Sequence, residues 1–341
     1  MQNFQYQYPY QEYNNIPFQD ITNKQITRQI MKDCSSACFN VFMIFVIMNF
    51  VSIPLIIFSV LPNGNSTGIS GMDNISFYLF NSILSFSAFF IFQIIYAWVK
   101  KIKFNDILQF NKLPPKTMFP LLIAGYSIFT LSNVVASIIN ESFAIIGIKD
   151  TTSLIDMTGN TVSEYILYFI AVAIVPAITE EFAFRGVILT ALRKYGDVFA
   201  IVSSSILFGF MHGNLVQIPF AFLGGIVLGY IRVYTNSMLP SMLLHFINNS
   251  ISVILDILNK NIDTNTMNLI YVIFTIVTLL LAIISIIYLA SNRQNLFDLK
   301  GDTTTEFEFS KKIKLFFDNA GMVFTLVAVF ITVVLSSNFV G

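Results

Sequence analysis

Three short groups of ionisable residues stand out in an otherwise apolar chain. The chain has only two histidines, His212 and His245, and each lies in a hydrophobic stretch, as does the acidic pair Glu180-Glu181. The composition is 55% hydrophobic and 11% charged. An ionisable residue is costly to place in a membrane, so inside a spanning segment it is by default a functional-site candidate. We expect these residues to form one site.

The two glutamates are not equivalent. Adjacent residues of a helix point about 100° apart, so they cannot share one role symmetrically. Arg185 follows Glu181 by four residues, the spacing and order that favour a salt bridge along a helix. Glu180 is then the freer carboxylate. Pro176, four residues before Glu180, removes one backbone hydrogen bond and can kink the helix, which opens room for water.

Each histidine has a partner one helical turn away. His212 follows Phe208 by four residues, and His245 precedes Asn249 by four, so each pair shares one helical face. Asn248 is also near that face. An imidazole can exchange a proton near neutral pH, and an Asn amide can donate to a developing oxyanion. Together with a carboxylate, these are the parts needed for water-mediated amide cleavage.

The elements that must position these groups are membrane-spanning helices. Several apolar runs of roughly 20 residues, enough to cross ~30 Å of hydrocarbon, predict an all-α, polytopic transmembrane helix bundle. About nine spans are predicted, at residues 37–61, 77–99, 118–147, 162–192, 197–213, 215–234, 237–259, 266–291 and 319–340.

Charge sets the predicted orientation of the bundle. A cytoplasmic N-terminus places all of the 19 lysines and arginines except Lys149 and Lys260 on or toward the cytoplasm, as the positive-inside rule requires. The net charge is zero, and basic clusters beside spans are explained by topology, so we expect no nucleic-acid partner. The predicted organisation is a polar cytoplasmic N-terminal segment (1–36), N-terminal transmembrane helices (37–161), a catalytic core (162–259), an eighth span (260–291), a cytoplasmic linker (292–318) and a C-terminal span (319–341).

Depth in the membrane gives an independent expectation. Counted from the predicted cytoplasmic helix ends at ~1.5 Å per residue, Glu180 lies about 20 Å deep and His212 about 22 Å deep. The count for His245, taken from Arg232, is also about 20 Å. If the three helices are straight neighbours, Glu180, His212 and His245 meet at one level.

The three motifs together resemble the signature of the CPBP intramembrane proteases, which include the type II CAAX prenyl endopeptidases and bacterial relatives linked to bacteriocin processing and immunity. The family's EExxxR, FxxxH and HxxxN stand here as 180–185, 208–212 and 245–249, within a resemblance that covers about residues 162–259. This resemblance implies a glutamic-type endopeptidase in the plasma membrane of a bacterium. Its partners would be the lipid bilayer and a peptide or protein substrate, either prenylated or membrane-associated.

The resemblance also implies a role for each motif residue. Glu180, assisted by His212, would activate a water molecule. His245 and Asn249 would hold the oxyanion. A partly desolvated carboxylate is a better base, and positioned donors are worth most where water is scarce, so these roles are physically reasonable.

Glu181 and Arg185 are the remaining motif residues, and three alternative functions stay open. Glu181 and Arg185 would orient the site, with no cofactor. Two carboxylates and two histidines could instead hold zinc in a metalloprotease, although no HExxH is present and Asn is a poor zinc ligand. A non-catalytic membrane protein that shields a partner, as an immunity factor would, is a second alternative. A proton-coupled transporter, with the same groups as its proton path, is a third.

Overall fold

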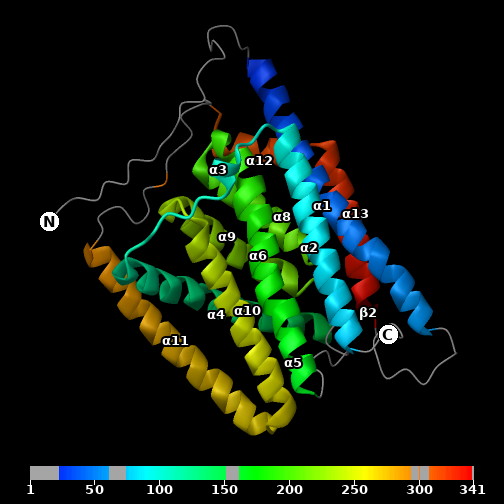
Figure 1. The fold of residues 1–341 in the computed structure, drawn as a ribbon, viewed down its shortest axis with the longest axis vertical. Helices are drawn as coiled ribbons and strands as arrows, with labels where there is room; N and C mark the ends of the chain where they lie inside the picture. The colour runs from blue at the N-terminus through cyan, green and yellow to red at the C-terminus, as the bar shows by residue number, and fades with distance from the viewer. Residues whose placement is uncertain (1–22, 61–73, 151–160, 293–298, 300–306, 340–341) are drawn as a thin grey trace.

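The chain folds as an all-α bundle with one very small sheet (Figure 1). The computed structural model describes residues 23–60, 74–150, 161–292, 299 and 307–339. In chain order the elements are α1 (Asn23–Val60), α2 (Asn74–Val99), α3 (Phe104–Ile107), α4 (Pro115–Ile145), β1 (Ile148–Asp150), α5 (Val162–Phe169), η4 (Ile170–Ile174), α6 (Val175–Glu181), η5 (Phe182–Ile188), α7 (Leu189–Leu192), η6 (Arg193–Tyr195), α8 (Asp197–Met211), α9 (Gln217–Thr235), α10 (Met238–Asn261), α11 (Thr264–Asn292), α12 (Phe309–Phe317), α13 (Ala320–Ser336) and β2 (Ser337–Phe339). The strands β1 and β2 pair antiparallel and link the end of α4 to the end of α13.

Each of the nine predicted spans coincides with a helical segment, and the all-α membrane bundle is confirmed. Among the described residues, seven helices are long and apolar enough to cross a membrane, or up to eight if the bent pair α12 and α13 is one span. The segment predicted at 197–213 is a helix, α8, but it has only 15 residues. At 1.5 Å per residue α8 reaches about 22 Å, which is shorter than a full crossing of ~30 Å.

Two predicted boundaries differ from the structure. α1 begins at Asn23, inside the segment predicted to be a polar tail, because its polar first turns still bury Ile30 and Cys34 completely. The predicted linker 292–318 contains α12. This short helix is amphipathic: Phe316 is buried, and the buried Lys312 donates from Nζ to the Tyr195 carbonyl oxygen at 3.0 Å.

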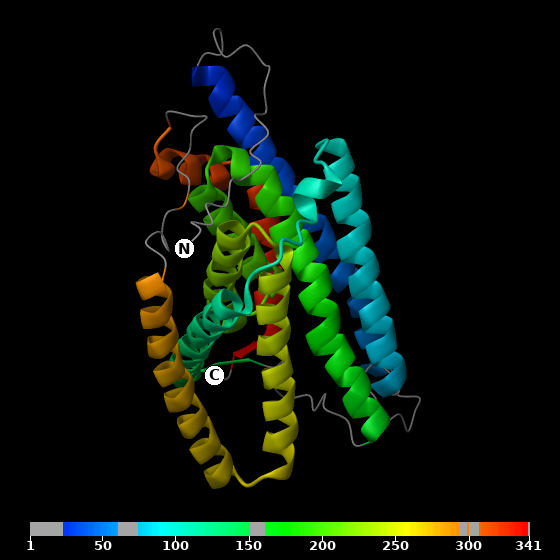
Figure 2. The same cartoon turned by 60° about the vertical axis from the view of Figure 1, so that its left-hand side comes forward.

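The helices at the centre of the bundle form a close hairpin. α8 and α9 pack against each other, and glycines allow their backbones to approach. A Cβ atom on Gly225 would lie 2.9 Å from Cβ of Ser205, and one on Gly209 would lie 2.9 Å from the Ile218 carbonyl oxygen. The helix α4 crosses the bundle obliquely (Figure 1), whereas α11 diverges from α10 beyond the turn that joins them (Figure 2).

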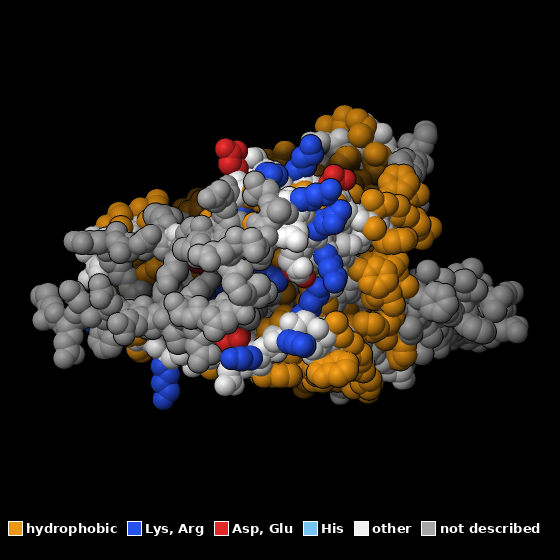
Figure 3. All heavy atoms as spheres, turned by 90° about the horizontal axis from the view of Figure 1, so that it is seen from above, with side chains coloured by type: hydrophobic (Ala, Val, Ile, Leu, Met, Phe, Trp, Pro, Cys, Tyr) orange, Lys and Arg blue, Asp and Glu red, His pale blue; other side chains and the backbone are white. Residues whose placement is uncertain are grey.

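Basic side chains gather at one end of the bundle, where Figure 3 shows them in a band. We call this the basic end; it carries the end of α2, the turn between η6 and α8, and α12, and by the positive-inside rule it is the predicted cytoplasmic end. Within it, the buried carboxylate of Asp33 lies 2.9 Å from Lys100 Nζ and 2.7 Å from Lys194 Nζ. Asp33 also accepts the Tyr195 hydroxyl at 2.7 Å. These contacts tie three separate segments together.

Candidate active site

The helix that carries the acidic pair is irregular on both sides of it. Two π-helical stretches, η4 and η5, flank α6. Pro176 has no N–H, so it cannot bond the carbonyl four residues earlier, that of Val172. The freed Val172 carbonyl oxygen instead accepts the Asn249 side-chain amide at 3.0 Å. Pro176 therefore leaves the Val172 carbonyl oxygen available to Asn249, and this hydrogen bond joins the helix to α10.

The structure separates the two glutamates as the helical geometry predicts. The Glu181 side chain is fully buried, and its Oε1 lies 3.1 Å from Nη1 of Arg185 and 3.0 Å from Nδ1 of His245. The Glu180 side chain is 20% exposed and lines a pocket. Glu181 is therefore committed to a cation and an imidazole, whereas Glu180 is available to a ligand in the pocket.

The hydrogen-bond partners of the two histidines indicate which ring nitrogen carries a hydrogen. His245 Nδ1 faces the Glu181 carboxylate, which only accepts, so Nδ1 donates. Its Nε2 lies 3.8 Å from Oε2 of Glu180, beyond hydrogen-bond distance. His212 Nδ1 lies 2.9 Å from the Phe208 carbonyl oxygen, so it also donates. In a neutral imidazole this leaves each Nε2 as an acceptor.

The Phe208 side chain is the common neighbour of these groups. Its ring is 4.2 Å from Cζ of Arg185, which lies over its face. The His212 and His245 rings stand nearly perpendicular to it, at centroid distances of 5.0 and 5.9 Å. From its spacing, Phe208 was predicted only to share one helical face with His212. The sequence signal for this wider role was an aromatic residue one helical turn before His212, which directly follows α8.

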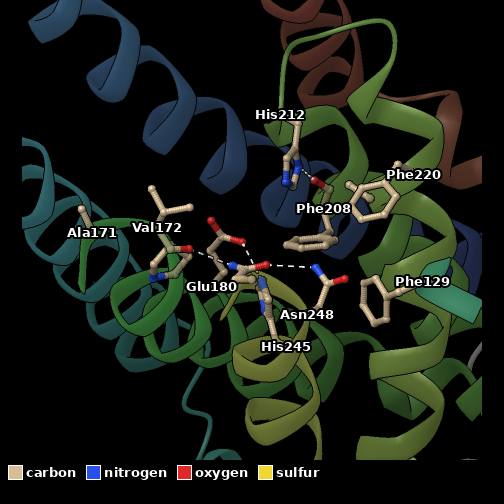
Figure 4. Close-up of a pocket in the computed structure, with 12 residues that line it drawn as sticks. Phe129, Ala171, Val172, Glu180, Phe208, His212, Phe220, His245 and Asn248 are labelled. Carbon is tan, nitrogen blue, oxygen red and sulfur yellow. Dashed lines mark hydrogen bonds and ion pairs between the residues drawn. The ribbon is translucent and has the colours of Figure 1, made fainter. Parts of the chain in front are cut away.

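All four predicted catalytic side chains line one pocket of about 210 Å³ (Figure 4). The amide of Asn248 also lines it and donates to Oδ1 of Asn249 at 3.1 Å. Glu180 and His212 make no hydrogen bond with each other in the described site. The lining residues are Phe129, Ala171, Val172, Pro176, Glu180, Phe208, His212, Phe220, Ala221, His245, Asn248 and Asn249.

The depth count was wrong for one of the three residues. α10 begins at Met238, so His245 lies seven residues, about 10 Å, beyond its start. The count from Arg232 crossed the turn between α9 and α10. His245 still meets Glu181. The turn before α10 is covered by residues 104–111, which we call the strap. The Met238 N–H donates to the Gln109 carbonyl oxygen at 2.6 Å.

The zinc alternative receives no geometric support from the part of the chain that the structure describes. Among the residues that the structure describes, no three His, Cys, Asp or Glu side chains are arranged to hold a metal ion. Arg185 lies against Glu181 and competes electrostatically with any cation there.

The fold and the pocket define a membrane protein whose carboxylate and imidazole groups meet inside a helix bundle, as expected of an intramembrane hydrolase. Residues 162–251 match the family model described as type II CAAX prenyl endopeptidase Rce1-like. The chain is 25% identical over 174 residues to the membrane-embedded CAAX protease MroQ of Staphylococcus aureus (strain USA300), covering 48% of this chain and 69% of that protein. No solved structure matches the chain. Residues 162–251 are therefore similar to CAAX-type proteases, and the chain is a membrane-embedded protease of the plasma membrane.

Proposed function

We propose that the chain is a glutamic-type endopeptidase in which Glu180 activates the attacking water. The observation that carries the proposal is the unequal environment of the two carboxylates: Glu181 is bound by Arg185 and His245, whereas Glu180 faces the pocket. A general base must be within reach of a water molecule and free of a competing partner. Glu180 lines the pocket, and His245 Nε2 lies 3.8 Å from its Oε2, beyond hydrogen-bond distance, which supports this role.

The other site residues would assist water activation, stabilise the oxyanion and position His245. Glu180 takes a proton from water as the oxygen attacks the peptide carbonyl, and His212 assists by accepting a hydrogen bond at Nε2. His245, which enters the cycle as the imidazolium and keeps both ring protons throughout, and the amide of Asn249 stabilise the developing oxyanion. The proton held by Glu180 then passes to the leaving amine. Glu181 and Arg185 keep His245 in place, and the cycle requires no cofactor.

The substrate class is proposed from the relatives. We expect a peptide or protein that reaches the membrane, and a prenylated cysteine near its C-terminus is the first candidate, because the matched family model describes a prenyl endopeptidase. A synthetic peptide carrying a farnesylated cysteine followed by three residues, beside the same peptide without the lipid, tests this candidate. Proteomic comparison of membranes carrying wild-type protein or Glu180→Gln would find other substrates.

A matched pair of carboxylate variants tests the mechanism. Glu180→Gln should abolish cleavage, whereas Glu308→Gln, at an exposed glutamate beside α12, should leave it intact. Full cleavage by Glu180→Gln would remove Glu180 from the proposed role. A biological effect that survives both Glu180→Gln and His212→Ala would favour the non-catalytic alternative.

A further inference from the structure

The short helix α12 lies outside the region that is similar to the CAAX-type proteases. Residues 162–251 match the family model, whereas α12 spans Phe309–Phe317. It lies at the basic end and is bent from α13 by 64°, so it crosses the direction of the spanning helices (Figure 1; Figure 2). The proposed cleavage gives α12 no role.

One side of α12 is fixed to the bundle. Phe316 is fully buried, and its ring stands nearly perpendicular to that of Phe199, with 6.3 Å between the centroids. Leu315 is also buried, and Lys312 donates from Nζ to the Tyr195 carbonyl oxygen at 3.0 Å. These contacts determine which side of α12 faces outward.

The exposed side of α12 has an apolar sector and a basic sector. Phe309, Ile313 and Phe317 are four residues apart, so they form one stripe about 80° wide. Phe309 is 46% exposed and Phe317 is 40% exposed. Lys314 and Lys311, both exposed, follow about 60° and 120° beyond Phe317 around the helix. An apolar stripe beside a basic one is typical of a helix that lies in the surface plane of a membrane.

The contacts of α12 place it near the level of the membrane interface. The single tryptophan, Trp98, is 79% exposed at the end of α2, and tryptophan in such a position marks the boundary between lipid and water. Two residues later, Lys100 binds Asp33 at 2.9 Å, and Asp33 accepts the Tyr195 hydroxyl at 2.7 Å. Because the Tyr195 carbonyl oxygen accepts from Lys312, α12 lies close to the depth of Trp98.

The exposed charges of α12 are mixed. Glu308 precedes the helix and Asp318 follows it, whereas Lys311 and Lys314 lie between them, and all four are exposed. Nζ of Lys311 lies 3.7 Å from the centre of the Phe307 ring, and an ammonium group over a ring keeps hydrogens for other acceptors. The two carboxylates therefore weaken the attraction of α12 for anions, but they stand at the ends of the helix and not between its lysines.

The neighbouring part of α1 adds positive charge. Lys24, Arg28 and Lys32 are exposed and four residues apart, so they share one face of α1, and α1 contacts α12. A second copy of the chain on this surface would bring two basic ends together, which costs free energy by like-charge repulsion. An anionic leaflet complements the same charges.

We propose that α12 docks on the membrane leaflet at the basic end, with Phe309, Ile313 and Phe317 among the acyl chains and Lys311 and Lys314 on the headgroups of anionic phospholipids. A lysine ammonium group binds phosphate as a point charge, without a fixed geometry, which suits mobile lipid headgroups. This docking does not depend on the proposed protease function. It gives a lipid-binding role to a segment outside the family match.

Quenching of tryptophan fluorescence by brominated lipids tests the docking and its lipid preference. Trp98→Phe removes the single tryptophan, and Phe309→Trp in that background places one indole on the apolar stripe. The full-length protein is reconstituted into vesicles of equal parts phosphatidylglycerol and phosphatidylcholine. In one preparation the bromines are on the phosphatidylglycerol chains, and in the other they are on the phosphatidylcholine chains. Bromine quenches on contact, so the two preparations compare the amounts of the two lipids beside position 309.

We expect quenching in both preparations, with phosphatidylglycerol enriched about fivefold beside position 309. This is about the factor that one lysine contributes near an anionic surface, because Glu308 and Asp318 offset part of the charge of the two lysines. Lys311→Gln/Lys314→Gln should bring the enrichment close to one, whereas Lys311→Arg/Lys314→Arg should keep it. The control Lys116→Gln, at the exposed start of α4, should also keep it.

Three results would overturn the docking. Absence of quenching by either lipid would show that protein, such as a second copy of the chain, covers the apolar stripe. Equal quenching by the two lipids would show insertion without a preference for anionic headgroups. Enrichment that survives Lys311→Gln/Lys314→Gln would show that these lysines do not bind the headgroups.

Discussion

Removal of one member of the buried ion pair should damage this protein more than removal of both. Arg185 is 1% exposed and Glu181 0% exposed, with 3.1 Å between Nη1 and Oε1. In Arg185→Met, the carboxylate of Glu181 loses its arginine partner and keeps the His245 imidazole and the Ser241 hydroxyl. A buried charge that loses its partner costs about 3–5 kcal/mol. The double variant Glu181→Leu/Arg185→Met leaves no unpaired buried charge at this position.

The expected thermal shift follows from the chain length. With an unfolding entropy of about 2.1 cal/mol/K per residue, a chain of 341 residues should lose about 4–7 °C of Tm for 3–5 kcal/mol. The double variant should return toward the wild-type Tm, since replacement of a buried pair by apolar groups is often neutral or stabilising. Its activity should nevertheless stay lost, because His245 no longer has a carboxylate to fix Nδ1.

The structure supplies the assay for this prediction. Cys34 and Cys38 are completely buried and not bonded to each other, so a thiol-reactive fluorophore reports their exposure as the protein unfolds in detergent. Peptide cleavage is measured on the same samples. A Tm for Arg185→Met equal to that of the wild type, or a double variant as unstable as Arg185→Met, would refute the assignment of a tightly coupled buried pair.

Three further outcomes are expected. Phe208→Leu should lower kcat, because it removes the ring that contacts Arg185 and both histidines. The control Phe199→Leu changes a ring that is also buried but lies away from the pocket, and it should keep the wild-type kcat. Equal kcat values in the two variants would contradict this prediction. Pro176→Ala restores an N–H that competes with Asn249 for the Val172 carbonyl oxygen, so kcat should fall while Tm holds or rises, and unchanged kcat would show that this bond does not position the amide. Dialysis against a chelator should leave cleavage unchanged, and activity that is lost and then restored by zinc would favour the metalloprotease.

Much of the fold could be predicted because membrane physics constrains it strongly. Apolar runs must form helices in hydrocarbon, so the positions of the spans followed from hydropathy. The unequal glutamates followed from the four-residue spacing to Arg185. Short helices were harder: α12 carries three lysines among its nine residues and resembles a linker, although Phe316 and even Lys312 are buried against the bundle.

The parts that could not be predicted depend on contacts between distant segments. The bond from Asn249 to Val172, within the π-helical stretch η4, joins residues 77 positions apart. The turn before α10 contacts the strap, whose Gln109 accepts a hydrogen bond from Arg232 across 123 positions. A count along one helix cannot reveal where its neighbour starts.

Because α8 has only 15 residues, the active site should respond to the thickness of the membrane. A helix of about 22 Å falls ~8 Å short of a hydrocarbon layer of ~30 Å. Because most residues of α8 are buried by neighbouring helices, those neighbours must tilt to match a thinner or thicker bilayer. The acyl-chain length of the host membrane would then adjust the tilt of the helices that carry Glu180 and His245 beside α8.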